Sequence, residues 1–264
     1  MLISALNKIF NPILGKKKYQ KLFEGLNTIS LNGMNIGLGG DINNSGEINL
    51  LYFIKKQLKN VKSPVLMDVG ANIGKYSHVL RDILGPYAII YAFEPVLETF
   101  RQLAINTKEI NIITKNFGLS DNNSRVTMYN DPNMDYLASI YERRLQHFDL
   151  YLNKKEFVEV RTLDTICKEE KINRIHFLKL DVEGHEFNVL QGALEMINNG
   201  AIDFIQFEFG GCNIDSRTFF QDFYYLLNSR YKLYRILKDG FSPINNYREE
   251  YESFKTTNYL AIRL

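Results

Sequence analysis

The chain of 264 residues has no tryptophan, only two cysteines and no long apolar run. Cys167 and Cys212 are too far apart to suggest a disulfide framework or a CxxC metal pair, and isolated thiols are typical of a reducing compartment. No stretch approaches the roughly 18 apolar residues of a transmembrane helix. The first residues, up to Pro12, lack the apolar core and cleavage site of a signal peptide. We therefore expect a soluble, cytoplasmic protein without a transmembrane segment.

The chain also lacks a strong excess of either charge. Lysine and arginine number 32 and aspartate and glutamate 30, which leaves a formal net charge of +2. Such a balance offers no electrostatic reason to expect a nucleic-acid partner, and we expect none. Hydrophobic residues make up 45% of the chain, enough for a sizeable core, and no repeat or break in composition demands a second independent domain.

Residues 1–60 differ from the rest, and we interpret them as N-terminal accessory or cap helices. Apolar residues first recur at helical spacing at Ile3, Leu6, Ile9 and Phe10. Lys16–Lys18 follow, so one interpretation is a helix on an anionic membrane surface. The other is a short helix packed on the domain or on a second subunit, which predicts a homodimer through the N-terminal helices. We favour the second because the apolar stretch is short and Pro12 interrupts it.

Residues 61–264 alternate short apolar runs with amphipathic segments, which predicts βαβ units with right-handed crossovers. The expected main strands cover residues 65–69, 88–93, 110–115, 175–180, 202–207, 232–237 and 259–264. The expected helices lie near residues 48–58, 73–83, 97–106, 163–171, 186–197 and 216–228. An insertion at about 117–160 interrupts the alternation with two short strands around a polar loop. The prediction is an α/β fold with a seven-stranded, mostly parallel sheet, helices on both faces and an N-terminal helical extension.

A glycine-containing loop follows the first of these strands at Asp68–Gly74. Gly70 allows a turn where a Cβ would clash with a ligand, and Gly74 lets the helix start close to it. The G-x-x-x-G spacing has Asn72 where a dinucleotide fingerprint has its middle glycine. Asp68 would repel a diphosphate and tolerate the cationic cofactor S-adenosylmethionine (SAM). We therefore predict SAM binding by Asp68, Gly70, Ala71, Asn72 and Gly74.

Two further residues extend the predicted cofactor site. Glu94 ends the second strand, where a carboxylate can accept hydrogen bonds from both ribose hydroxyls. Its alternative role is in the N-cap region of the next helix. Asn116 follows the third strand and could bind the adenine through its side-chain amide, whereas Asp121 could simply belong to a turn.

With these pieces in place, the chain resembles the FkbM family of SAM-dependent methyltransferases over roughly residues 65–264. The matching stretches are Asp68–Gly74, Ala92–Pro95, Asn116–Asp121, Leu163–Asp164, Leu178–Glu186, Phe207–Glu208 and Asn258–Ala261. The chain has Gly118 near a position where family members commonly have alanine. The resemblance implies a Rossmann-like class I methyltransferase fold whose last strand is antiparallel. It also implies methylation of a hydroxyl, often on a sugar or a secondary metabolite, and it does not identify the substrate.

A second polar cluster follows the fourth strand, whose carboxyl end should face the transferred methyl group. We predict catalytic roles for His185, Asp181 and Glu183. Neutral His185 is the preferred base, because an unperturbed imidazole titrates near neutral pH. Asp181 would contact the methionine end of SAM or orient the base. The predicted substrate-binding residues are Glu183, Glu208 and Lys179, with Lys179 paired to one of the acids.

Two alternatives remain for this cluster. Asp181 and Glu183 could only cap the helix that begins near His185. Alternatively, Asp181, Glu183, His185 and Glu208 could hold a divalent metal that polarises the substrate oxygen, which we do not favour. In the insertion, Tyr136, Tyr141, Arg143 and Arg144 could form a substrate lid or belong to an ordinary surface loop.

The sequence thus predicts a SAM-dependent O-methyltransferase acting on a carbohydrate hydroxyl, such as a nucleotide-linked sugar or a glycan intermediate of polysaccharide biosynthesis. The alternatives are a methyltransferase for a non-sugar metabolite and a non-catalytic SAM- or nucleotide-binding protein of the same fold. A nucleic-acid or protein methyltransferase is disfavoured, because the chain has no Asn-Pro-Pro-Tyr type motif and no basic groove is indicated.

Overall fold

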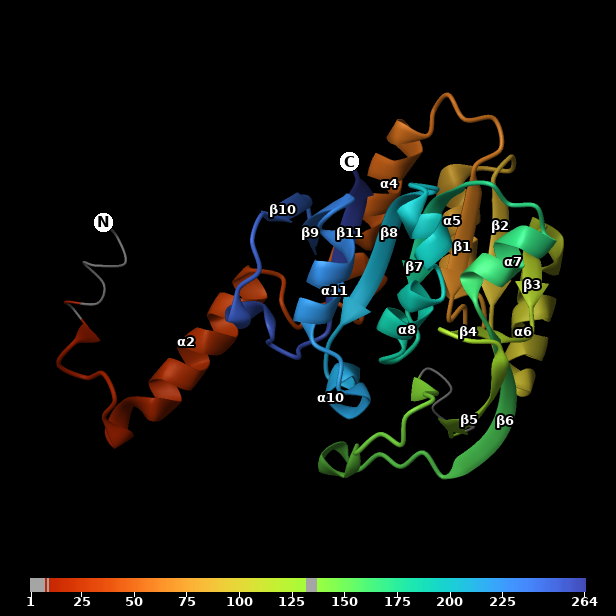
Figure 1. Ribbon diagram of the computed structural model, residues 1–264. Coiled ribbons are helices and arrows are strands. Elements are labelled where there is room, and N and C mark those ends of the chain that lie inside the picture. The colour runs from red at the N-terminus through yellow and green to blue at the C-terminus, as the bar shows by residue number, and fades with distance from the viewer. Residues whose placement is uncertain (1–7, 9, 132–136) are drawn as a thin grey trace.

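The computed structural model describes residue 8, residues 10–131 and residues 137–264 (Figure 1). Ile3, Leu6, Ile9 and Tyr136, which carry parts of the predictions above, lie outside the described residues. Within the described residues, no helix is both long and apolar enough to cross a membrane.

A large central sheet organises the chain, with the strand order β10-β9-β11-β8-β7-β1-β2-β3. Its strands are β1 (Val65–Val69), β2 (Ile89–Phe93), β3 (Ile113–Lys115), β7 (Ile175–Leu180), β8 (Ile202–Phe209), β9 (Tyr231–Leu237), β10 (Gly240–Ile244) and β11 (Thr257–Arg263). The neighbours from β3 to β8 are parallel, and β11 is antiparallel to both β8 and β9. This is the Rossmann-like class I methyltransferase arrangement, including the predicted antiparallel last strand.

All seven predicted main strands are present, and the sheet has an eighth that the sequence did not predict. β10 forms a hairpin with β9 at the edge of the sheet. It contains Pro243, which argues against a strand in a sequence pattern. An edge strand tolerates proline, because one side of an edge strand needs no donor. The insertion forms a separate small sheet of β4 (Gly118–Leu119), β6 (Lys154–Arg161) and β5 (Ser124–Asn130).

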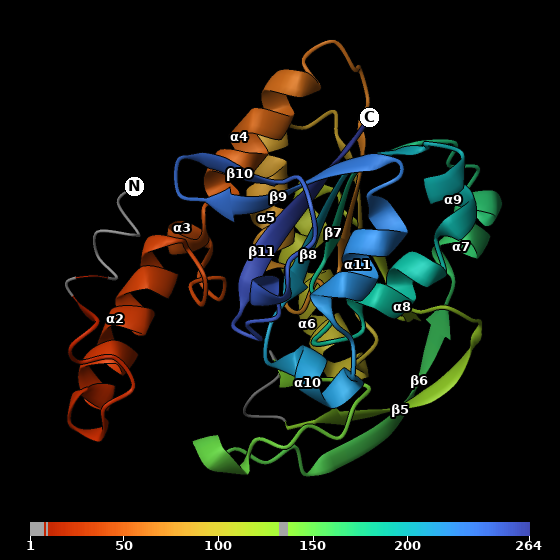
Figure 2. The same cartoon turned by 60° about the vertical axis from the view of Figure 1, so that its left-hand side comes forward.

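Helices cover both faces of the large sheet, as predicted (Figures 1 and 2). The α-helices of the described residues are α2 (Gln20–Gly33), α3 (Ile42–Ser45), α4 (Glu47–Gln57), α5 (Lys75–Leu84), α6 (Leu97–Thr107), α7 (Leu163–Glu169), α8 (Glu186–Gln191), α9 (Leu194–Asn198), α10 (Cys212–Ser216) and α11 (Phe220–Leu227), and of these α2 does not cover the sheet. The single helix expected at 186–197 is broken near Gly192, whose carbonyl accepts a hydrogen bond from the Asp164 amide, 3.0 Å away. The helix expected from residue 216 begins instead at Phe220.

Side chains of the strands alternate between two apolar layers, one on each face of the sheet. Met67 on β1 belongs to the layer that also contains residues of α7, α8, α9 and α11. Its neighbour Leu66 belongs to the layer that contains Leu50 and Ile54 of α4 and residues of α5. The helix α4 therefore packs in the same apolar layer as α5, and the division of the chain near residue 60 stays a prediction.

Candidate functional site

A cavity of about 1080 Å³ opens at the carboxyl ends of the central strands. This is the switch point of the sheet, because the chain leaves β1 toward β2 on one side and later returns as β7 on the other. Ligands of open α/β sheets bind at such a point. The lining residues come from segments 37–47, 69–79, 94–95, 118–119, 128, 137–148, 160, 179–185, 208–212 and 254–258.

The glycine loop lines this cavity between β1 and α5. Gly70 has φ +82°, and a Cβ added there would lie 1.8 Å from the carbonyl oxygen of Asp181. The sequence predicted a clash with a ligand, and the structure shows a clash with the protein's own backbone after β7. Gly74, with φ +92°, packs against α6, where a Cβ would lie 2.9 Å from the side chains of Leu103 and Thr107.

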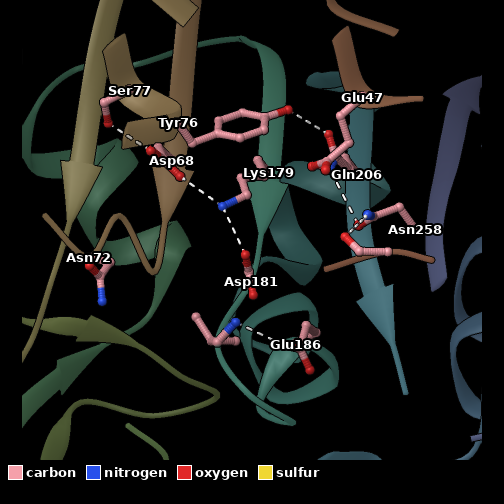
Figure 3. Close-up of polar contacts among 12 residues, drawn as sticks. Glu47, Asp68, Asn72, Tyr76, Ser77, Lys179, Asp181, Glu186, Gln206 and Asn258 are labelled. Atoms are coloured by element: carbon pink, nitrogen blue, oxygen red, sulfur yellow. Dashed lines mark hydrogen bonds and ion pairs between the residues drawn. The ribbon is translucent and has the colours of Figure 1, made fainter. Parts of the chain in front are cut away.

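Asp68 is fully buried and is not among the residues that line the cavity. Its carboxylate accepts hydrogen bonds from the Ser77 hydroxyl at 2.7 Å and from the Lys179 ammonium at 3.3 Å (Figure 3). Asp68 therefore acts on the cavity through Lys179, and its predicted direct contact with SAM has no support in this geometry.

Lys179 stands at the wall of the cavity with a second acid. Its Nζ lies 3.1 Å from Asp181 Oδ2 and 4.4 Å from the ring centre of Tyr76. Burial opposes its charge, but the carboxylates of Asp181, Asp68 and Glu47 more than offset that effect, so the pKa of Lys179 is raised. The predicted pairing of Lys179 with an acid is present, and it holds the Asp181 carboxylate in place at the end of β7.

A polar chain that no motif predicted continues from Tyr76 (Figure 3). The Tyr76 hydroxyl donates to Gln206 Oε1 at 2.8 Å, and Gln206 Nε2 donates to Glu47 Oε1 at 2.6 Å. Burial raises the pKa of Glu47. Asn258 Nδ2 donates to the Gly39 carbonyl at 3.1 Å. Asn258 belongs to Asn258–Ala261, the last of the stretches that match the family. That match was the available sequence signal that residues near Gly39 and Asn258 contribute to the cavity.

Glu94 is buried and lines the cavity, and it also organises the loops around it. Its two carboxylate oxygens accept hydrogen bonds from the Asn72 amide at 3.1 Å and the Val96 amide at 2.9 Å. Its position in the structure is therefore compatible both with binding a ribose and with a role in the N-cap region of α6. Asn116 is not among the lining residues, because its side-chain amide donates to the carbonyls of Glu94 and Pro95. Its contact with adenine stays a prediction.

Glu183 lies in the turn after β7 with φ +51°, a conformation that is uncommon outside glycine. Its carboxylate forms an ion pair with Arg143, and its carbonyl accepts a hydrogen bond from Ser139 Oγ at 2.8 Å. Burial raises the pKa of Glu183 to about 8, although Arg143 opposes the shift. A carboxyl group with such a pKa is partly ionised near neutral pH, and its ionised form is a stronger base than an ordinary carboxylate.

His185 lies beside Glu183 in the cavity wall and is 6% exposed. Its Nε2 lies 2.9 Å from Ser120 Oγ, and its Nδ1 lies 3.0 Å from the Tyr141 hydroxyl. Burial lowers the pKa of His185 to about 4, far below the near-neutral value on which its predicted role as a base depends. At neutral pH the ring is therefore uncharged, as expected, but both of its nitrogens already contact a protein hydroxyl group.

Two further acids, Glu186 and Glu208, differ in position: Glu186 is buried within the protein, whereas Glu208 lines the cavity. Glu186 is fully buried, and its Oε1 accepts hydrogen bonds from the amides of Val182 and Gly184. Glu186 thus stabilises the turn between β7 and α8, and no side-chain cap hydrogen bond is present at His185, the N-cap residue of α8. Glu208 lines the cavity at the end of β8, and burial raises its pKa. Within the described part of the chain, no group of three His, Cys, Asp or Glu side chains could hold a metal ion.

The insertion contacts the site, and its role as a substrate lid stays a prediction. Besides the contacts of Ser139 and Arg143 with Glu183, Tyr141 bonds both His185 and Asn188. Arg144 is exposed, and its backbone amide donates to the Asp215 carboxylate at 3.3 Å. Sequence reasoning identified Tyr141 and Arg143 but missed Ser120 and Ser139. Ser120 lies within the matching stretch Asn116–Asp121, which was the available signal, whereas Ser139 has no motif around it.

With this geometry established, comparisons with known proteins are informative. The family model "Methyltransferase FkbM domain" matches residues 68–236. The hexuronic acid methyltransferase AglP of Haloferax volcanii is 28% identical over 160 residues, covering 58% of this chain and 60% of the relative. The methyltransferase sdnD of Sordaria araneosa is 28% identical over 160 residues, covering 50% and 61%. The chain spans about three fifths of the length of these relatives.

Solved structures are similar only at a low level. An O-methyltransferase from Bacillus cereus in complex with SAH has a TM-score of 0.45 and 10% identity, covering 98% of this chain and 97% of that one. A putative O-methyltransferase from Klebsiella pneumoniae has a TM-score of 0.46 and 8% identity, covering 97% and 94%. Similarities this weak support no conclusion of their own.

Proposed function

The chain belongs to the FkbM methyltransferase family, and on that premise we propose that it transfers a methyl group from SAM to a hydroxyl of a carbohydrate or a similar small molecule. The observation that carries this proposal is the meeting of two sets of residues in one cavity. The glycine loop and Glu94 lie at the ends of β1 and β2, and the acids Asp181, Glu183 and Glu208 lie at the ends of β7 and β8.

The residues present fit SAM. The cavity volume is sufficient for a ligand of that size. Glu94 offers a carboxylate for hydroxyl groups of a ribose, and α5 begins at the cavity wall with its positive dipole end, which suits a carboxylate. The acids across the cavity suit a sulfonium cation. When bound, SAM supplies an electrophilic methyl group.

The chain's own residues would have to activate the acceptor. A hydroxyl is a poor nucleophile near neutral pH, and removal of its proton as the new bond forms lowers the barrier. We propose Glu183 as the group that accepts this proton, supported by its raised pKa and its place in the cavity. Arg143 would hold the carboxylate in position, and Tyr141 and Ser120 would orient His185 beside it.

A carbohydrate acceptor is supported by two observations. Asp181, whose side chain is 41% exposed, and Glu208 present carboxylates that can accept hydrogen bonds from several hydroxyls. In addition, one relative is named for methylation of a hexuronic acid. A nucleotide-linked sugar or a glycan intermediate is the acceptor we propose, and a non-sugar metabolite is the second candidate.

The proposal is tested by transfer of labelled methyl groups from SAM to a panel of free sugars, uronic acids, nucleotide-linked sugars and simple phenols. We expect labelling of a sugar, with the methyl group located on oxygen by NMR. Binding of SAM in calorimetry without transfer to any acceptor would favour the non-catalytic alternative. Transfer only to the phenols would favour a non-sugar metabolite.

The base is tested by Glu183→Gln and His185→Ala. If Glu183 accepts the proton, Glu183→Gln should lower kcat by about 10²-fold or more while SAM affinity stays the same. Glu109→Gln removes an exposed carboxylate far from the cavity and serves as the matched control. Full turnover in Glu183→Gln, together with a loss of that size in His185→Ala, would return the role to His185.

A further inference from the structure

The helix α2 lies apart from the sheet and its covering helices in both views (Figures 1 and 2). None of its 14 residues is buried. The short N-terminal helix that the sequence predicted has its pattern at Ile3–Phe10, mostly outside the described residues, so α2 is a separate helix. Among the described residues α2 buries no side chain against its own domain, so its surface is available to something else.

One face of α2 is apolar. Leu22, Leu26 and Ile29 follow the i, i+4, i+7 spacing of a single helix face, and they are 47%, 40% and 69% exposed. The neighbouring Phe23 packs on the ring of Phe10, with 5.9 Å between ring centres. Leu14 and Met34 extend the exposed apolar surface at the two ends of the helix. A contiguous exposed apolar stripe of this kind marks an interaction site.

The same segment carries the positive charge of the protein. Residues 8–34 contain five lysines and one acid, Glu24, which gives +4. Since the whole chain has +2 and residues 1–7 have no charged side chain, residues 35–264 carry −2. Lys16–Lys18 and Lys21 stand at the beginning of α2, next to the apolar stripe.

We propose that α2 docks this apolar face on an anionic lipid surface. An apolar stripe beside a lysine cluster is the pattern of helices that lie in the membrane interface, where lipid headgroups supply the negative charge. A second copy of α2 would cover the stripe as well, but it would bring a second lysine cluster with only Glu24 to compensate. The charge therefore favours the lipid surface over a helix pair. This inference does not depend on the proposed acceptor.

The test is flotation of the full chain with vesicles of phosphatidylcholine, with and without phosphatidylglycerol. We expect the protein to float with the anionic vesicles only, and rising salt to weaken the binding. The triple change Leu22→Ser, Leu26→Ser and Ile29→Ser should abolish flotation. The change Lys16→Gln, Lys17→Gln and Lys18→Gln should weaken binding by at least about tenfold.

The matched control removes exposed apolar side chains elsewhere, by Tyr87→Ser and Ile105→Ser, and should float as the unmodified chain does. Unchanged SAM binding in all variants confirms that each is folded. Absence of flotation with anionic vesicles, or equal flotation of the Leu22, Leu26 and Ile29 variant, would overturn the proposal. A dimer in sedimentation velocity that this variant dissociates, without vesicle binding, would assign the face to a second copy instead.

Discussion

The two sides of the cavity are held together by different kinds of contact. On the cofactor side, formed by residues 70–74 and Glu94, the loop depends on backbone conformation and on backbone amides that donate to one carboxylate. The acceptor side is formed by residues 181–186 with Ser139, Tyr141 and Arg143. There, side chains of the insertion contact the Glu183 carbonyl, the Glu183 carboxylate and the His185 ring, about 40 residues away in the sequence. A backbone turn is specified locally, whereas such side-chain pairs exist only once the chain has folded.

The largest expected effect is on the backbone of the cofactor side. Gly70→Ala would place a Cβ 1.8 Å from the Asp181 carbonyl oxygen in a backbone conformation with φ +82°. Because neither backbone can give way easily, we expect a loss of unfolding free energy of about 4 kcal/mol or more. Denaturant unfolding measures it. Gly240→Ala has open space around the new Cβ and should change the stability little; similar unfolding of both variants would contradict this account of the loop.

The second expected effect is a pH dependence of stability caused by the buried imidazole of His185 on the acceptor side. Burial lowers the pKa of His185 from 6.5 to about 4, so the unfolded chain binds a proton in this interval and the folded chain does not. The contribution of His185 to stability is therefore present above pH 6.5 and lost as the pH falls toward 4, by about 3 kcal/mol in all.

The measurement is the unfolding free energy of the unmodified chain and of His185→Gln across that pH interval. The unmodified chain should lose more stability than the variant as the medium becomes acidic. Parallel pH profiles would mean that His185 is not buried in its neutral form.

The third effect concerns the pair that joins the insertion to the turn after β7. Arg143 favours the charged form of Glu183 and so opposes the raised pKa of that carboxyl. Arg143→Gln should therefore raise the pKa of Glu183 further and move the acid limb of the kcat/KM profile to higher pH. At neutral pH we expect roughly a tenfold loss of kcat/KM. Arg144→Gln, which changes the exposed neighbour of Arg143, is the control. An unmoved acid limb in Arg143→Gln would show that Arg143 does not influence the proton transfer.

The smallest effect returns to the cofactor side. Glu94→Gln keeps the size of the side chain and removes one charged acceptor from the cavity wall. We expect SAM affinity to fall by roughly fivefold, the worth of about one hydrogen bond, with kcat at saturating SAM nearly unchanged. Calorimetry and steady-state kinetics distinguish the two. A loss of kcat without a loss of SAM affinity would contradict the role of Glu94 in SAM binding and assign it to the acceptor.

Much of the domain could be predicted because its elements are short and strongly patterned. β1 and β7 occupy the predicted residues, since a buried parallel strand reads as an apolar run. The hairpin strand β10 was missed because Pro243 weakens the pattern. The helix α2 was missed because its apolar stripe meets no partner within the chain, and Glu47 was missed because its importance depends on Gln206, far away in the sequence.

Strand ends, glycines and acids occur at short, regular separations along the chain. These local patterns were sufficient to predict the fold class, the resemblance to the family and the position of the glycine loop relative to Glu94. Only in the folded chain does it become evident that the Asp181 backbone requires Gly70, that Asp68 is buried against Lys179, and that burial lowers the pKa of His185 to about 4. These outcomes depend on burial and on contacts between distant segments. Burial changes the charge state and availability of a side chain without leaving a mark in the local sequence.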